Sequence, residues 1–293
     1  MDKTTIIKRK VSYLELLPEY SNKERSKIVI IPVPYDGTST WIKGSDKGPD
    51  ALMDASANLE LYDIETDSEV YKNGIFTEDP IKESSSPEDM IESVYSKVTV
   101  NLKKNKFIVV IGGEHSVSIG AVKSFAEKYK DLNVLQLDAH ADLRQEYNGS
   151  KNNHACVIAR IREICPIVQV GIRSMDVSEK KYIDNDKIFF AEDLQGDDDW
   201  IDNVVTKLSR NVYLTLDLDV FDPSIMPSTG TPEPGGLLWY TVLKLLKKVI
   251  EKRNIVGFDV TELCPNENNR SPDFMAAKLI YKILSYRFKN CKD

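Results

Sequence analysis

The feature that most constrains this chain is a repeated pairing of a short apolar run with an amphipathic segment from residue 27 onward. The runs are rich in Val and Ile, as expected for strands buried on both faces of a parallel sheet. The predicted strands are 28–33, 107–111, 134–137, 167–172, 188–190, 212–216 and 255–260. The predicted helices are 87–103, 116–129, 155–164, 200–209, 238–252 and 273–287. This alternation predicts an α/β fold, with a mostly parallel sheet and helices on both faces.

The chain shows no internal repeat and no Gly/Ser-rich linker, so we expect a single domain over residues 1–293. Residues 1–26 read as a polar N-terminal extension with a few apolar anchors. The stretch 73–86 contains Pro80 and a run of three serines, and it is predicted to be a mobile loop within the domain.

Composition excludes several function classes. The chain has a net charge of −7 and lacks the basic stripe that a nucleic-acid groove needs. This negative charge favours attraction of a cationic substrate. No apolar run approaches the ~18–20 residues of a membrane span, and the first twenty residues lack the apolar core of a signal peptide. The four cysteines show neither CxxC spacing nor a disulfide pattern, which predicts reduced thiols and a cytoplasmic location.

Ionisable side chains directly follow three of the predicted strands. In parallel sheets, ligands bind beyond the carboxyl ends of the strands, so these positions are candidates for chemistry. The three segments are GGEHS at 112–116, DAHAD at 138–142 and DLDVFDP at 217–223. While the backbone stays extended, alternate residues share one face. Their candidate ligands are His115, Asp138, His140, Asp142, Asp217 and Asp219.

Such a cluster would be costly to bury without a counter-charge, and divalent cations would remove that cost. Four carboxylates and two imidazoles suffice for two ions if some carboxylates bridge. Without thiolates, the donor set suits Mn²⁺, with Co²⁺, Ni²⁺ or Zn²⁺ as alternatives, and it argues against a structural zinc site. Taken singly, D-x-D could be a solvated loop, and the glycine-rich segment could be a turn with Ser116 as a helix cap. Their joint occurrence after three strands favours the metal site.

The third and last histidine of the chain, His154, follows the DAHAD segment. A single histidine that opens a predicted helix fits a cap or a surface position as well as a catalytic role. Its closeness in sequence to DAHAD makes it a candidate.

With these residues in hand, the chain resembles the ureohydrolases, the family of arginase and agmatinase, and it is most similar to the agmatinase branch. The resemblance runs from about residue 29 to the C-terminus. It rests on GGEHS, DAHAD, LDLDVFDPSIMPSTGTPEPGG at 216–236 and FDVTELCP at 258–265, with PYDG at 34–37 further upstream. It implies an arginase-like three-layer α/β/α sandwich that assembles as a homotrimer or homohexamer.

The resemblance also implies a role for each site residue. Two Mn²⁺ per subunit would be held, one by His115 and Asp142, the other by His140 and Asp219, with Asp138 and Asp217 bridging. The catalytic residues would be Glu262, which grips the substrate guanidinium, Asp142, which accepts a hydrogen bond from the nucleophile, and His154, which carries protons.

The implied reaction is hydrolysis of agmatine to putrescine and urea. The loop 143–150 does not resemble the loop with which arginases hold an α-amino acid. Glu146 and Asp222 are candidates to face the substrate amine, and both fit ordinary solvated carboxylates at least as well. Aminopropylagmatine, guanidinobutyrate, guanidine and arginine are alternative substrates. Two departures from the family pattern, Asn153 and Ser228, bear on substrate choice.

Two readings from other classes are a non-catalytic polyamine-binding homologue and a single-zinc amidohydrolase related to polyamine deacetylases. The six intact ligand positions disfavour both.

Overall fold

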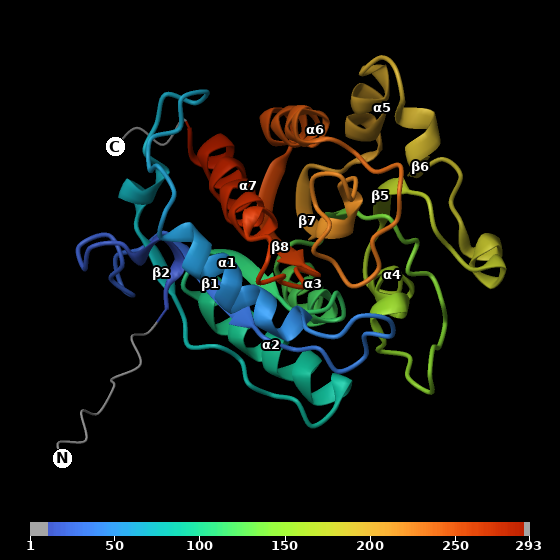
Figure 1. Cartoon of the computed structure of the whole chain (residues 1–293), viewed down its shortest axis with the longest axis horizontal. Coiled ribbons are helices and arrows are strands. Elements are labelled where there is room, and N and C mark those ends of the chain that lie inside the picture. The colour runs from blue at the N-terminus through green and yellow to red at the C-terminus, as the bar shows by residue number, and fades with distance from the viewer. Residues whose placement is uncertain (1–10, 290–293) are drawn as a thin grey trace.

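The computed structural model describes residues 11–289, and its centre is one sheet of eight strands that pair in parallel throughout. The strands are β1 (Ile28–Val33), β2 (Ile75–Thr77), β3 (Phe107–Gly112), β4 (Leu132–Leu137), β5 (Ile167–Ile172), β6 (Ile188–Phe190), β7 (Asn211–Asp217) and β8 (Asn254–Thr261). Their order is β2-β1-β3-β8-β7-β4-β5-β6, which runs from left to right in Figure 1.

Helices cover both faces of the sheet. They are α1 (Gly48–Ser56), α2 (Pro87–Lys103), α3 (Val117–Lys128), α4 (Val157–Ile161), α5 (Asp199–Lys207), α6 (Trp239–Lys252) and α7 (Ser271–Phe288). One core packs side chains of α1, α5, α6 and α7 against the sheet, and a second packs those of α2, α3 and α4 against the opposite face. In Figure 1, α6 and α7 lie above the sheet and α2 lies below it.

The strands feed the two cores alternately. In β1, Ile28 and Ile30 contribute to one core, whereas Val29, Ile31 and Val33 contribute to the other. This alternation follows from the two-residue period of a strand, and burial on both faces explains why the runs are apolar without interruption. The predicted three-layer α/β/α sandwich is confirmed.

Two predictions of local structure were wrong. The stretch 73–86 is not a loop throughout, because it contains β2, which pairs with β1 at the edge of the sheet. A strand of three residues is too short to show a periodicity. The predicted helix 155–164 is shorter than expected, since a 3₁₀ turn (His154–Cys156) precedes the five-residue α4. Helix α1, which begins with Gly48-Pro49, was not predicted.

Part of the N-terminal extension belongs to the core. Tyr13 is 1% exposed, and its hydroxyl donates to the carbonyl of Ala277 in α7. Three cysteines are free thiols, and Cys291 lies outside the described residues. Among residues 11–289, no helix combines the length and the apolar character needed to cross a bilayer.

Strand order decides where the site lies. Strands β3 and β4 follow each other in the chain but are not neighbours in the sheet, because β8 and β7 lie between them. The four central strands β3, β8, β7 and β4 therefore end side by side at one edge, and each is followed by candidate site residues. This is the switch point at which open parallel sheets bind ligands.

Candidate metal centre and active site

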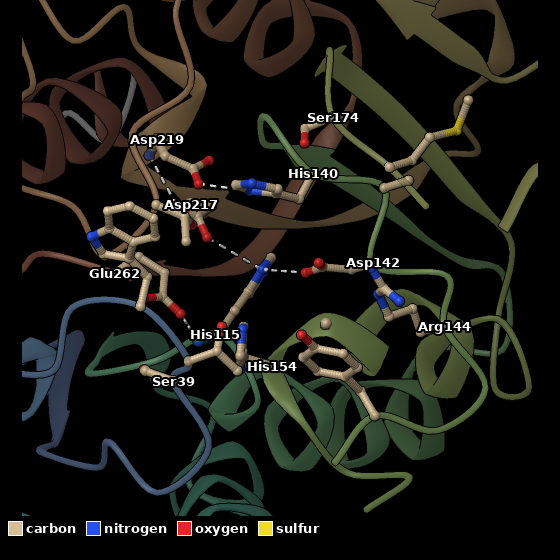
Figure 2. A pocket seen from close by; sticks show the side chains of 18 of the residues that line it. Ser39, His115, His140, Asp142, Arg144, His154, Ser174, Asp217, Asp219 and Glu262 are labelled. Carbon is tan, nitrogen blue, oxygen red and sulfur yellow. Dashed lines mark hydrogen bonds and ion pairs between the residues drawn. The ribbon is translucent and has the colours of Figure 1, made fainter. Parts of the chain in front are cut away.

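A cavity of about 260 Å³ opens above the carboxyl ends of the four central strands. Figure 2 shows that imidazoles and carboxylates from separate strands converge on it. Of the predicted site residues, those that line it are His115, His140, Asp142, His154, Asp217, Asp219 and Glu262. Asp138 is fully buried beneath them. The structure thus brings all eight predicted residues together.

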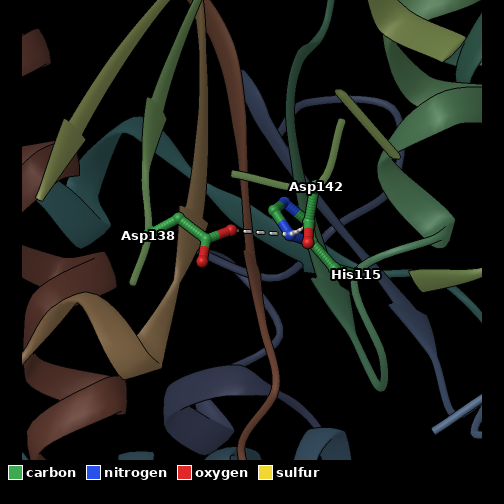
Figure 3. A group of neighbouring side chains, drawn as sticks. All are labelled: His115, Asp138 and Asp142. Atoms are coloured by element: carbon green, nitrogen blue, oxygen red, sulfur yellow. Dashed lines mark hydrogen bonds and ion pairs between the residues drawn. The ribbon is translucent and has the colours of Figure 1, made fainter. Parts of the chain in front are cut away.

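The first group of candidate ligands joins β3 to the segment after β4. His115 Nδ1 lies 3.1 Å from Asp138 Oδ2 and 3.1 Å from Asp142 Oδ2, with all three side chains buried (Figure 3). Asp217, at the end of β7, is 3.6 Å from the same nitrogen. One nitrogen facing three carboxylates is a geometry that a cation between them would satisfy.

The second group shares Asp138 with the first. His140 Nδ1 lies 2.8 Å from Asp219 Oδ2 and 3.6 Å from Asp138 Oδ1. Asp219 and Asp217 are linked as well, since the Asp219 N–H donates to Asp217 Oδ1 at 2.9 Å. Because its two oxygens face different imidazoles, Asp138 lies where a bridging ligand would be needed.

Crowding of buried acids changes how the cluster titrates. Burial, and next the charge of Asp138, raises the pKa of Asp142 to about 7. Burial and then Asp219 raise the pKa of Asp217 well above its ordinary value. Burial opposes a charge on His115, but hydrogen bonds to Asp138 and Asp142 raise its pKa well above 6.5. The metal-free cluster therefore retains protons that a bound cation would displace.

The residues fit a pair of divalent ions. The two ligand groups contain only imidazole nitrogens and carboxylate oxygens. This donor set suits Mn²⁺ and its neighbours, and it is excessively charged for a site that holds no cation. The arrangement suggests a binuclear metal site.

A buried network behind His115 was not predicted. His115 Nε2 lies 2.9 Å from the hydroxyl of Thr215, which donates to Asp259 Oδ1 at 2.7 Å. The Tyr213 hydroxyl donates to the other oxygen of Asp259 at 2.8 Å. Such outer contacts fix the tautomer of a ligand histidine, and here they leave Nδ1 for the cation. The available signal was an acid inside the apolar run 255–260.

Glu262 reaches the cavity through an unusual backbone conformation. It directly follows β8 and has a φ of 65°, in the left-handed region that a non-glycine residue rarely adopts. Its N–H donates to the Gly113 carbonyl at 2.7 Å, and its Oε1 accepts the His115 N–H at 2.7 Å. Burial and then the charge of Glu114 raise the pKa of Glu262 well above its ordinary value. Asp142 has a similar φ of 52°.

His154 lines the cavity next to His115 and across from His140 and Asp219 (Figure 2). Its ring meets Tyr147 edge-on, with centroids 6.5 Å apart. Burial, helped by the nearby imidazoles, lowers the pKa of His154 to about 4. The ring is therefore neutral at pH 7 and titrates well below the near-neutral value of a free histidine.

The two departures from the family pattern differ in how well their side chains are hydrogen-bonded. Asn153 is buried, and its side chain accepts the Ala155 N–H at 3.0 Å, so it caps the turn that carries His154 as a serine would. Ser228 is buried, and its carbonyl accepts the Cys264 N–H as the carbonyl of a glycine would, but its hydroxyl has no hydrogen-bond partner. Neither Glu146 nor Asp222 lines the cavity, which favours the alternative that both are ordinary solvated carboxylates. Asp222 accepts N–H groups of Ser224, Gly235 and Gly236.

Comparison with known proteins agrees with this geometry. A family model described as "Arginase family" matches residues 26–285. The chain belongs to the arginase family. It is 35% identical over 270 residues to an N(1)-aminopropylagmatine ureohydrolase of Synechocystis sp., covering 88% of each chain. It is 32% identical to an agmatinase of Pyrococcus horikoshii, over 87% of this chain and 90% of the relative.

A solved structure extends the agreement to three dimensions. The agmatine ureohydrolase of Thermoplasma volcanium superposes with a TM-score of 0.83 at 34% identity, covering 92% of this chain and 93% of that one. The predicted membership of the ureohydrolases, the arginase-like fold and the hydrolase class of this arginase-family chain are confirmed.

Proposed function

We propose that this arginase-family chain hydrolyses a guanidino compound with a polyamine tail, releasing urea, and that N(1)-aminopropylagmatine is the preferred substrate. The observation that carries the reaction type is the convergence of two Asp/His groups and Glu262 on one cavity. The choice of substrate is supported by the relative at 35% identity, which bears that name, and by carboxylates placed beyond the metal centre.

The two groups would hold two Mn²⁺, with His115 and Asp142 at one, His140 and Asp219 at the other, and Asp138 and Asp217 between them. When bound, the ions lower the pKa of water toward 7, which supplies a nucleophile at neutral pH. Asp142 lines the cavity, and it would accept a hydrogen bond from the attacking water and orient it toward the substrate carbon. It holds this position at a left-handed φ of 52°.

Glu262 holds the guanidinium. Its Oε1 is occupied by the His115 N–H, whereas its Oε2 lies on the side of Gly230, where an added Cβ would come within 3.8 Å. Both Glu262 and Gly230 line the cavity, so a planar cation bound there would lie beside the carboxylate. Charge-assisted hydrogen bonds from the guanidinium then fix its carbon for attack.

His154 moves the proton that the leaving amine needs. A neutral imidazole at pH 7 accepts a proton from the attacking water and returns it to the amine nitrogen as the C–N bond breaks. Its low pKa makes the protonated ring a strong acid, so the transfer to the amine is favourable.

The substrate tail would extend along the outer wall of the cavity. Asp176 and Ser174 line this wall, and Glu233 accepts the Ser174 hydroxyl at 2.9 Å. Both carboxylates are partly exposed. N(1)-aminopropylagmatine carries two amines beyond its guanidinium and agmatine carries one, so a second acid at the rim favours the longer compound. We propose agmatine as the second substrate, and a homotrimer or homohexamer as the assembly.

The test is urea release by the Mn²⁺-loaded protein from N(1)-aminopropylagmatine, agmatine, arginine, guanidinobutyrate and guanidine, with metal content determined on the same sample. We expect two ions per chain and the highest kcat/KM with the first compound. A higher kcat/KM with agmatine would move the substrate and keep the chemistry. Absence of urea from every compound at full metal content would refute the proposed function.

The substitution Asp176→Asn tests whether a carboxylate on the outer wall of the cavity binds the substrate tail. The asparagine can still accept the Ser178 N–H that Asp176 now accepts, so the turn keeps its cap. We expect a twofold to fivefold loss of kcat/KM, about the strength of an exposed ion pair, with the longer substrate only. Glu146→Gln, which removes an exposed carboxylate outside the cavity, is the matched control. Equal effects of the two changes would contradict the rim assignment.

A further inference from the structure

A buried carboxylate that the proposed reaction does not use lies behind His154. Glu114 is fully buried and accepts four hydrogen bonds, from the N–H groups of Thr38 and Ser39 and from the hydroxyls of Thr38 and Ser116. Each carboxylate oxygen therefore receives two donors. Burial raises the pKa of Glu114, and these donors oppose that effect. A carboxylate surrounded in this way acts only as an acceptor.

Thr38 connects this carboxylate to His154. The Thr38 hydroxyl donates its single proton to Glu114 Oε1 at 2.7 Å. The Thr38 hydroxyl oxygen, Oγ1, also accepts the backbone N–H of His154 at 2.8 Å, and it lies 3.2 Å from His154 Nδ1. A hydroxyl has one proton and two lone pairs. With the proton given to Glu114, the hydroxyl can only accept from the ring, so Nδ1 must carry the hydrogen.

We propose that Thr38, held by Glu114, is a positioning residue that keeps neutral His154 in the Nδ1–H tautomer and leaves the lone pair of Nε2 for the substrate proton. The kinetic part of this inference rests on the proposed function, whereas the tautomer does not. The two residues are 116 positions apart, so the contact belongs to the tertiary structure and not to a local turn.

The hydrogen bond from the ring to Thr38 persists after the ring accepts a proton. When Nε2 is protonated, Nδ1–H continues to donate to Thr38, and the negative charge of Glu114 lies one hydroxyl further on. Glu114 thus orients His154 as the carboxylate of a catalytic triad orients its histidine, but through the hydroxyl of Thr38. Tyr147 meets the ring edge-on and limits its rotation.

The tautomer can be measured directly, because the chain contains only three histidines. Imidazole ¹⁵N spectra of the metal-free protein, labelled with ¹⁵N-histidine and held at pH 7.5, distinguish protonated from unprotonated ring nitrogens. The spectrum of His154→Asn assigns the third ring by subtraction. We expect Nδ1 protonated and Nε2 unprotonated in the wild type. The opposite tautomer would overturn the proposal whatever the enzyme's activity.

Kinetics test the positioning role. Thr38→Val removes the hydroxyl at nearly constant volume and should lower kcat about tenfold, part of the 10²–10⁴-fold that proton transfer contributes, with KM and metal content retained. Thr38→Ser restores the hydroxyl and should recover most of kcat. Thr229→Val is the matched control, because it removes a buried hydroxyl that has no partner.

The decisive comparison is made in the His154→Asn background. If Thr38 acts through His154, Thr38→Val should change kcat there by less than about twofold. A full additional loss, or a loss that Thr38→Ser does not recover, would overturn the proposal. If the wild type releases no urea from any substrate, the proposed function fails while the tautomer result stands, so the two failures are distinguishable.

Discussion

The left-handed backbone of Glu262 predicts that a glycine at this position is more stable than an alanine, the reverse of the usual order of these two substitutions. Its φ of 65° costs a non-glycine residue about 1–2 kcal/mol, because Cβ approaches the following carbonyl oxygen. Glycine escapes that cost. Elsewhere glycine is less stable than alanine by about 0.5–1 kcal/mol, because it loses more chain entropy on folding.

We therefore expect Glu262→Gly to be more stable than Glu262→Ala by about 1 kcal/mol. Asp217 is the control, since it ends the neighbouring strand at an ordinary φ of −77°. There the alanine variant should be the more stable by about 0.5–1 kcal/mol. Comparing glycine with alanine at one position cancels the carboxylate charge, which both variants lose. The two positions should differ by a total of about 2 kcal/mol.

The assay is thermal unfolding of the four metal-free variants in chelator, where 1 kcal/mol corresponds to about 2–4 °C in Tm. Both Glu262 variants should lose urea release, since neither retains the carboxylate that we propose holds the guanidinium. An alanine variant at 262 as stable as its glycine counterpart would refute the reasoning. It would mean that the conformation relaxes without cost once the side chain is gone.

Three further predictions follow from the site. His154→Asn should lower turnover about 10²-fold with metal content unchanged. Burial lowers the pKa of His154 to about 4, so the unfolded chain binds a proton on this ring at a higher pH than the folded chain does. The free energy of unfolding should therefore decrease as pH falls from about 6.5 to about 4. In acid denaturation, His154→Asn should lose up to about 3 kcal/mol less of this free energy than the wild type over the same pH range. Mn²⁺ affinity measured by calorimetry should fall by about eightfold or more from pH 7.5 to 6, with proton release, because burial raises the pKa of Asp142 to about 7. A pH-independent affinity would contradict this. Gly113→Ala should destabilise the fold by about 2 kcal/mol or more in denaturant unfolding, because its Cβ would lie 2.1 Å from the Tyr35 carbonyl oxygen, and unchanged stability would exclude that clash.

Much of the site was predictable because its residues directly follow apolar strands. The convergence of Asp138, His140 and Asp142, and of Asp217 and Asp219, was predicted, but the extended backbone assumed for it was wrong. Asp142 has a left-handed φ of 52°, and Asp219 lies in a 3₁₀ turn (Leu218–Val220). The strands themselves were predicted to within a few residues, since burial on both faces leaves a continuous apolar run. Strand β2 was not predicted because it is too short to show a periodicity. Helix α1 was not predicted because no stripe of apolar residues at helical spacing was recognised in its nine residues.

The candidate ligands, the parallel sheet and the edge at which the candidate site lies could be predicted from the sequence, because each depends on short-range spacing and on strand direction. Only the tertiary structure decided that β8 and β7 lie between β3 and β4, which closes the cluster. It also decided the left-handed backbone of Glu262 and the contact between Thr38 and His154. These features depend on residues far apart in the chain, and no local pattern of hydrophobicity or propensity encodes which distant groups will pack together.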